Sequence, residues 1–175
     1  EMMLNYVDIS VSPQAEPKNV LAAPAPASPA QPDQASIRDR FIGVWKLINC
    51  VTSNTDGARV YIYGDKPEGR LTYDKAGRMS ALLMKPGRRE STAPNMREAS
   101  PEDLREAANT FTAYYGNFEV DEAARTVFHH VKLSFYPNWV GTSLKRTYEF
   151  EGNRLTLTAT ASGATTRLVW ERQPD

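Results

Sequence analysis

Cysteine and histidine are scarce in this 175-residue chain, which contains one cysteine and two histidines. Because a disulfide needs two cysteines, the single Cys50 excludes an internal disulfide framework, and its apolar surroundings indicate a small core residue. The histidines, His129 and His130, are adjacent and point to opposite faces of any strand that holds them. They cannot share a metal ion from one strand, and no cluster of ligand residues surrounds them, so we expect no metal.

Net charge and long apolar runs are absent as well. Lysine plus arginine number 21 and aspartate plus glutamate number 21, which gives a formal net charge of zero. This balance gives no electrostatic reason to expect nucleic acid or an anionic membrane as a partner. No stretch approaches the ~20 consecutive apolar residues of a membrane-spanning helix. Glycine-rich phosphate loops and the nucleophile elbow of hydrolases are also missing, so the sequence indicates no cofactor.

Residues 1–36 differ in composition from the rest of the chain. Proline and alanine dominate residues 22–32, and such a segment buries too little apolar surface to offset the entropy lost on ordering. We expect a disordered Ala/Pro-rich tail at 1–36 and one folded domain at 37–175, with an extra strand at 2–11 as an alternative for the start of the tail. Similar spacers follow export signals in bacterial envelope proteins, which slightly favours a periplasmic or secreted location over a cytoplasmic one. The opening residues lack the features of a signal peptide, so the sequence does not show whether one was removed.

The folded domain is rich in β-forming residues separated by short turns. Strands are predicted at residues 41–51, 59–63, 69–73, 78–84, 112–120, 126–136, 143–151, 154–161 and 165–171. Short links between successive strands imply antiparallel neighbours, and a sheet of this length removes its free edges by closing on itself. We therefore predict an all-β, antiparallel up-and-down barrel of about eight to ten strands.

One short helix is predicted from Ser100 to about residue 110. Ser100 is a good N-cap, Pro101 suits the first helical position, and acidic residues follow at the positive end of the helix dipole. Together with residues 85–95 this helix forms the longest insertion between strands, which suits a lid over the barrel mouth. Its arginines, Arg88 and Arg89, are expected to be solvated.

Motifs near both ends of the domain resemble those of lipocalins. Gly43-Val44-Trp45 looks like the Gly-x-Trp signature of the first strand, and residues 168–172 resemble the last strand. In lipocalins an arginine of the last strand often lies over that tryptophan. The resemblance implies that Arg172 packs on Trp45 and closes one end of the barrel.

An ordered set of further motifs is similar to the bacterial and fungal lipocalin-like domain family, a group of calycin-type barrels. The set consists of residues 73–80, 129–131, 137–142 and Arg146-x-Tyr148, and the resemblance extends over about residues 41–172. The chain lacks the second and third motifs of secreted animal lipocalins, so their transport functions do not carry over. Some members of the lipocalin-like family are encoded among enzymes of natural-product or aromatic metabolism.

Alternation along residues 143–151 places a charged group inside the predicted barrel. Leu144, Arg146, Tyr148 and Phe150 share one face, and this apolar face should point into the lumen. A cation in an apolar lumen is unfavourable unless it is paired or used on an anion. Arg146 is therefore either an anchor for a ligand carboxylate, enolate or phenolate, or a structural arginine at the mouth.

The same alternation makes His129 the better lumen candidate of the two histidines. His129 shares its face with the apolar Val127, Val131, Leu133 and Phe135, although a β-bulge would exchange it with His130. A lumen histidine could act as an acid or base, or it could simply be hydrogen-bonded within the wall.

The remaining candidate lining residues are aromatic or flexible. Tyr73, Met79 and Tyr114 face inward by alternation, and Trp139 lies in a loop where it either caps the mouth or packs beneath it. The predicted ligand-binding residues are Tyr73, Met79, Tyr114, His129, Trp139, Arg146 and Tyr148.

These residues favour a module that binds a small, mostly apolar or aromatic molecule in the lumen. The alternative is a cofactor-independent isomerase, cyclase or lyase acting on a carbonyl or aromatic compound, with His129, Arg146 and Tyr148 as candidate catalytic residues. A third possibility is a structural domain with a filled barrel. The sequence leaves the ligand, catalysis and the oligomeric state open.

The composition of the tail predicts that it is dispensable for stability. Deleting residues 1–35 should change the melting temperature by only a few degrees, because the segment contributes no core residues. Differential scanning calorimetry of the full and shortened chains measures this change. A large drop would show that residues 2–11 form a strand of the barrel or of an interface.

Overall fold

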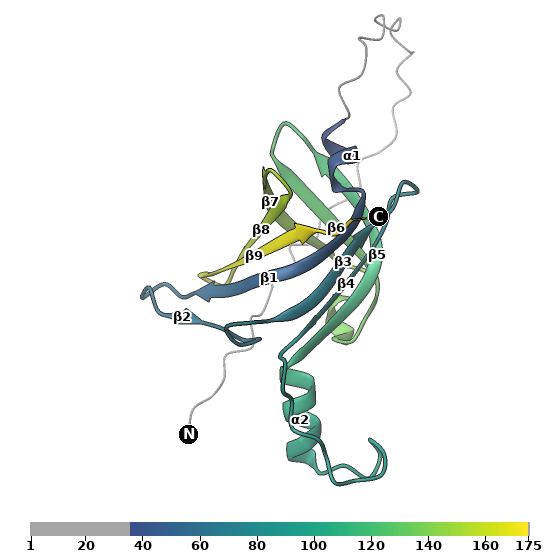
Figure 1. Cartoon of the computed structure of the whole chain (residues 1–175), viewed down its shortest axis with the longest axis vertical. Coiled ribbons are helices and arrows are strands. Elements are labelled where there is room, and N and C mark those ends of the chain that lie inside the picture. Colours follow the sequence, from purple (N-terminus) through teal and green to yellow (C-terminus); the bar gives the residue numbers. More distant parts are fainter. Residues whose placement is uncertain (1–35, 175) are drawn as a thin grey trace, which may run out of the picture.

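The computed structural model describes residues 36–174, so the predicted tail, apart from Ser36, and the alternative strand at 2–11 lie outside the described residues. Within this range, nine antiparallel strands form one sheet in the order β2-β1-β3-β4-β5-β6-β7-β8-β9. Pairing of β1 with β9 closes the sheet, and all strands except β2 belong to the closed barrel (Figure 1). The predicted up-and-down barrel is confirmed.

The strands are β1 (Gly43–Ser53), β2 (Arg59–Val60), β3 (Glu68–Tyr73), β4 (Arg78–Met84), β5 (Phe111–Asp121), β6 (Thr126–Ser134), β7 (Ser143–Glu151), β8 (Arg154–Ala161) and β9 (Ala164–Arg172). The helices are α1 (Ile37–Phe41), α2 (Pro101–Asn109) and the 3-10 turn η1 (Pro137–Trp139). Among these residues, no helix has both the length and the apolar character needed to cross a membrane.

The start of the domain differs from the prediction. Residues 37–40, which precede the predicted strand, and Phe41, predicted as its first residue, fold as α1, whose N-cap Ser36 accepts a hydrogen bond from the backbone N–H of Asp39 at 3.2 Å. The predicted strand at 59–63 is reduced to two residues. It ends there because a turn begins at Tyr61, whose carbonyl oxygen accepts a hydrogen bond from Gly64 at 2.9 Å.

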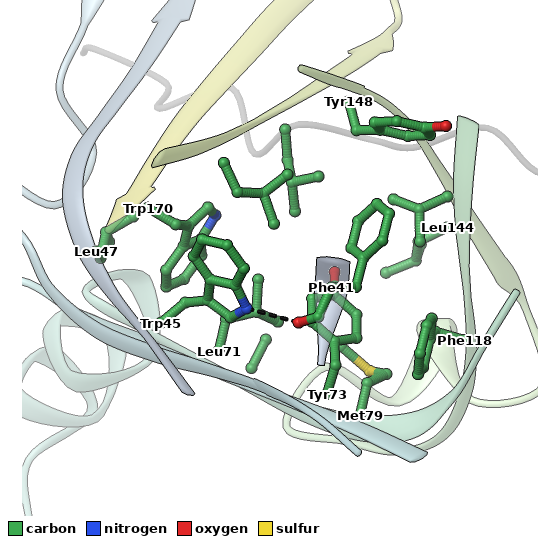
Figure 2. Packing of buried hydrophobic residues seen from close by; sticks show 14 of the residues in the cluster. Phe41, Trp45, Leu47, Leu71, Tyr73, Met79, Phe118, Leu144, Tyr148 and Trp170 are labelled. Carbon is green, nitrogen blue, oxygen red and sulfur yellow. Dashed lines mark hydrogen bonds between the residues drawn. The ribbon is translucent and has the colours of Figure 1, made fainter. Parts of the chain in front are cut away.

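Phe41, the last residue of α1, plugs one end of the barrel, which we call the α1 end. The Phe41 side chain is fully buried, and its ring lies 5.3 Å from Tyr73, 5.1 Å from Tyr148 and 5.0 Å from Phe150, each in an edge-on arrangement. Figure 2 shows Phe41 among the inward-facing rings of the strands. This end of the lumen is therefore filled by aromatic side chains.

Trp45 and Arg172 hold this plug in place, as the lipocalin resemblance implied. The two residues are direct partners in the pairing of β1 with β9, and the guanidinium carbon lies 4.2 Å from the Trp45 ring centre. The Trp45 indole donates a hydrogen bond to the Phe41 carbonyl at 2.8 Å, drawn in Figure 2. Arg172 donates to the carbonyls of Ile42, at 2.6 Å, and Arg40. One cation thus links the first strand, the last strand and α1.

A β-bulge in β6 corrects the predicted face of two residues. The register between β5 and β6 shifts at Gly116, so Leu133 and Phe135 point outward and are 53% and 46% exposed. The bulge requires glycine at position 116, because a Cβ there would lie 1.9 Å from the carbonyl oxygen of His130. The shift falls beyond Val131, so the order of the two histidines is not exchanged.

The opposite end of the barrel, which we call the open end, carries α2 and η1. Burial is mixed among the inward positions near this end. Thr112, Thr166 and Leu168 are half-buried, whereas Leu83, paired with Thr112, and Thr52, paired with Thr166, are 5% and 3% exposed.

The insertion between β4 and β5 does not lie across the open end as the predicted lid. In Figure 1, α2 extends beyond the ends of β4 and β5, and its main contact with the barrel is with β5. Of the two arginines predicted to be solvated, Arg89 is exposed, with 57% of its side chain accessible, and Arg88 is half-buried. Arg88 donates to the carbonyl of Ala107 at 2.9 Å, and Arg89 pairs with Asp103. Both arginines therefore attach the loop to α2.

Replacing Trp45 by alanine tests the closure of the barrel. The change removes a side chain that is 1% exposed, together with its cation–π contact and its hydrogen bond to α1. We expect the free energy of unfolding to fall by about 3–5 kcal/mol, measured by urea denaturation. Lys46→Ala, at the neighbouring exposed position, is the control and should change it by about 0.5 kcal/mol or less. A wild-type urea midpoint for Trp45→Ala would contradict the closure.

Candidate functional site

A chain of three polar side chains crosses the interior of the barrel. His129, in the middle of β6, is 1% exposed and contacts a tyrosine through each ring nitrogen. The Tyr73 hydroxyl lies 2.7 Å from Nε2, and the Tyr114 hydroxyl lies 2.9 Å from Nδ1. We call Tyr73, His129 and Tyr114 the polar chain. It joins β3, β6 and β5, which are not all neighbours in the sheet.

Alternation of β6 places the two histidines as the sequence pattern indicated. His130 lies on the outer face, where its Nδ1 is 2.7 Å from the Ser143 hydroxyl and its Nε2 is 3.3 Å from a Glu119 carboxylate oxygen. Its side chain is 41% exposed. His129 is therefore the only histidine of the chain that reaches the lumen.

Burial keeps the polar chain uncharged. Desolvation lowers the pKa of His129 well below its usual 6.5, and the positive charge of Arg146 and the neighbouring His130 lower it further. Desolvation also raises the pKa of Tyr73 and of Tyr114 above 10, while the charge of Arg146 acts in the opposite direction on both. At neutral pH the imidazole and both phenols are neutral.

Arg146 is the one charged side chain among the buried residues of the described range. It lies on β7 opposite Val127, and the side chains of β7 alternate so that it points inward, with only 8% of the residue exposed. Its Nη1 is buried and has no hydrogen-bond partner. Residues 36–174 contribute no carboxylate within ion-pair distance of Arg146, so the cation enters the lumen uncompensated.

The other predicted lining residues fall into two groups. Trp139 is half-buried in η1 at the open end, and its ring meets Tyr114 edge-on at 5.7 Å, so it packs beside the polar chain. Tyr148 and Met79 lie towards the α1 end instead. Tyr148 packs against Phe41, and Met79 is paired with Tyr73 across β3 and β4. Figure 2 shows both among the side chains around the plug.

Two interior residues were not predicted as part of the site. Phe41 was assigned to the first strand, and nothing in the sequence indicates that a five-residue helix turns its ring into the barrel. Trp170 is 2% exposed, and its buried Nε1–H has no hydrogen-bond partner. Alternation with Leu168 on β9 would have placed Trp170 inside. That its indole N–H lacks a hydrogen-bond acceptor cannot be read from the sequence.

The geometry limits what His129 can do chemically. Both ring nitrogens contact tyrosine hydroxyls, so a proton could pass between His129 and a bound molecule only through a tyrosine whose pKa is raised. Among the described residues, no group of His, Cys, Asp and Glu side chains is arranged to hold a metal ion. The arrangement suits hydrogen bonding to a guest better than proton transfer.

The fold and its interior define a calycin-type barrel, and the sequence gives the family. Residues 42–173 match the family model of the lipocalin-like domain, and the chain belongs to this family. It is similar to the 4'-hydroxy-3'-methoxypropiophenone carrier protein ppsC of Aspergillus oryzae, with 33% identity over 55% of this chain and 97% of the carrier.

Two solved structures align with most of this chain at low identity. A de novo designed fluorescence-activating β-barrel aligns with a TM-score of 0.41 and 12% identity, covering 80% of this chain and 100% of the design. Fatty-acid-binding protein 1 of Echinococcus granulosus aligns with a TM-score of 0.37 and 13% identity, covering 78% of this chain and 99% of that protein.

The lowered pKa of His129 predicts a loss of stability in acid. Between pH 7 and pH 5 the unfolded chain takes up a proton at this histidine, near 6.5, while the folded chain does not. The free energy of unfolding should therefore fall by about 2 kcal/mol over this range because of His129 alone.

Urea denaturation at several pH values measures this effect. His129→Gln should remove that part of the pH dependence, whatever its effect on stability at pH 7. His130→Gln is the matched control on the outer face and should keep the wild-type dependence. A wild-type pH dependence in His129→Gln would show that His129 does not cause the loss.

Proposed function

We propose that the barrel binds a small, mostly apolar or aromatic molecule in its lumen and carries it unchanged. The observation that carries this proposal is the polar chain and Arg146 within a mostly apolar interior whose α1 end is filled by Phe41. An eight-stranded barrel is just wide enough to hold its own side chains or one small ligand. An apolar body with one polar end matches such an interior.

The direction of binding follows from the two ends. Phe41 and the rings around it fill the α1 end, whereas Thr112, Thr166 and Leu168 near the open end are half-buried. Trp139 stands at the open end against Tyr114, so an entering ligand would meet this pair before it reaches His129. We expect the polar group of the ligand to point towards the polar chain.

The relative from Aspergillus oryzae supports a carrier rather than an enzyme. It is named as a carrier of a hydroxyphenyl ketone, and this chain covers 97% of its length. That compound combines an aromatic body with polar oxygens, the chemistry that the interior described above would accept. The engaged ring nitrogens of His129 point the same way, because a general base needs a free nitrogen beside its substrate.

Titration of the full chain with 4'-hydroxy-3'-methoxypropiophenone tests the proposal. We expect saturable binding of one molecule per chain, followed by calorimetry and by tryptophan fluorescence. Ala81→Phe should weaken binding at least about tenfold, because Ala81 is 1% exposed, faces inward and is paired with Tyr114. Native mass spectrometry of the freshly purified protein would detect a retained ligand.

Leu82→Phe is the matched control for this experiment. Leu82 is the next residue of β4, faces outward and is 43% exposed, so the same added ring should leave the affinity unchanged. Thermal unfolding followed by circular dichroism shows whether each variant keeps its fold. No saturation with this ketone or with a fluorescent fatty acid would contradict ligand carriage. Equal affinities of the two folded variants would place binding outside the lumen.

A further inference from the structure

The interior has more hydrogen-bond donors than acceptors, and the polar chain shows this by a simple count. When all three side chains are neutral, they carry three polar hydrogens, one on each hydroxyl and one on the imidazole. Only two contacts join them, and each contact uses one hydrogen. If Nδ1 carries the proton, the hydrogen of Tyr114 is left over; if Nε2 carries it, that of Tyr73 is left over. One hydroxyl hydrogen therefore has no acceptor in either tautomer.

Two further buried donors also lack acceptors. Nη1 of Arg146 and Nε1 of Trp170 are both buried, and neither has a hydrogen-bond partner. A buried donor without an acceptor is destabilising, and the effect is larger for a charged donor. These two donors and the spare hydroxyl hydrogen come from three different strands, β7, β9 and either β3 or β5, so the surplus is not confined to one part of the wall.

No side chain of the described range supplies the missing negative charge. The buried polar and charged residues between 36 and 174 are Thr52, Thr126, His129, Arg146 and Thr156. Aspartate and glutamate are absent from this set, so the lumen carries one uncompensated positive charge. The positive charge of Arg146 acts to lower the pKa of all three members of the polar chain, so they share one electrostatic environment.

We infer, building on the proposed function, that the lumen takes its ligand as an anion, with the negative oxygen of a phenolate bound by Nη1 of Arg146. The spare hydroxyl hydrogen of the polar chain donates a second hydrogen bond to the ligand. The phenolate supplies both the acceptor and the charge that the lumen lacks. Charge-assisted hydrogen bonds of this kind are roughly twice as strong as neutral ones. The ligand class is therefore an aromatic compound with an acidic hydroxyl.

The inference predicts that the protein changes the ionisation of its ligand. A guanidinium in hydrogen-bond contact with the ligand oxygen favours the phenolate over the phenol. The pKa of the bound phenol should therefore fall by about 1 or more relative to free solution. By linkage, the phenolate then binds at least about tenfold more tightly than the phenol. The hydroxyphenyl ketone named above is a suitable probe, because its phenolate is conjugated to the ketone. Ionisation of its hydroxyl therefore shifts the absorbance of the compound to longer wavelength.

Absorbance titration of the probe against pH, free and bound to the full chain, measures this shift. The 3',4'-dimethoxy analogue is the matched control ligand, because it differs only by one methyl group on the 4' oxygen and has no ionisable proton. Its affinity should be independent of pH over the range in which the phenol ionises and the protein stays folded.

Three variants assign the effect to Arg146. Arg146→Met keeps the volume of the aliphatic stem without the charge, so the pKa of the bound phenol should return to the free value or exceed it. Arg146→Lys keeps a charge and should retain part of the shift. Lys145→Met removes an exposed positive charge from the next position of β7 and should give the wild-type shift.

The outcomes separate this inference from the proposed function. A bound phenol whose pKa in the wild-type protein equals or exceeds the free value would overturn the inference, even if the dimethoxy analogue binds. An equal lowering in the folded Arg146→Met variant would overturn the role of Arg146. If neither the phenol nor its analogue binds, the proposed function itself fails, and the inference fails with it.

Discussion

The stack of Arg172 on Trp45 lies where the sheet becomes a barrel, and the rest of the interior depends on it. The two residues are partners in the pairing of β1 with β9, and the same guanidinium holds the backbone at the end of α1. A cation–π contact of this kind is worth roughly 0.5–2 kcal/mol. Its larger effect is geometric, because it fixes where Phe41 enters the lumen and so which end of the barrel is filled by aromatic rings.

The fold was readable from the sequence because strand periodicity and turn residues repeat along the whole domain. Alternation correctly placed Arg146, Tyr114 and the two histidines, since a period of two decides the face of a residue locally. It failed where local geometry departs from the period. Leu133 was placed inside because a one-residue bulge cannot be seen in a hydrophobic pattern, although Gly116 on the neighbouring strand is what permits it. Five residues are also too few to show the helical period of α1.

The candidate site was predicted as a set of inward-facing residues but not as an arrangement. Tyr73 and His129 are separated by 56 positions in the chain, and their contact depends on how the strands are tilted around the barrel. Sequence alternation says that both face inward and nothing about which side chains meet. The unpaired Nη1 of Arg146 is less accessible still to sequence reasoning, because it is defined by the acceptors that are missing around it.

The Phe41 plug has a kinetic consequence for any cargo. Because Phe41 fills the α1 end, a cargo that enters by the other end, as proposed, also has to leave there before another can enter. An excess of a second ligand could then occupy empty barrels, but it could not raise the dissociation rate of a molecule already inside. The residence time would depend on motions of the segments around the open end, which occur on nanosecond to microsecond timescales for loops. Release to a downstream acceptor would require contact with that end alone.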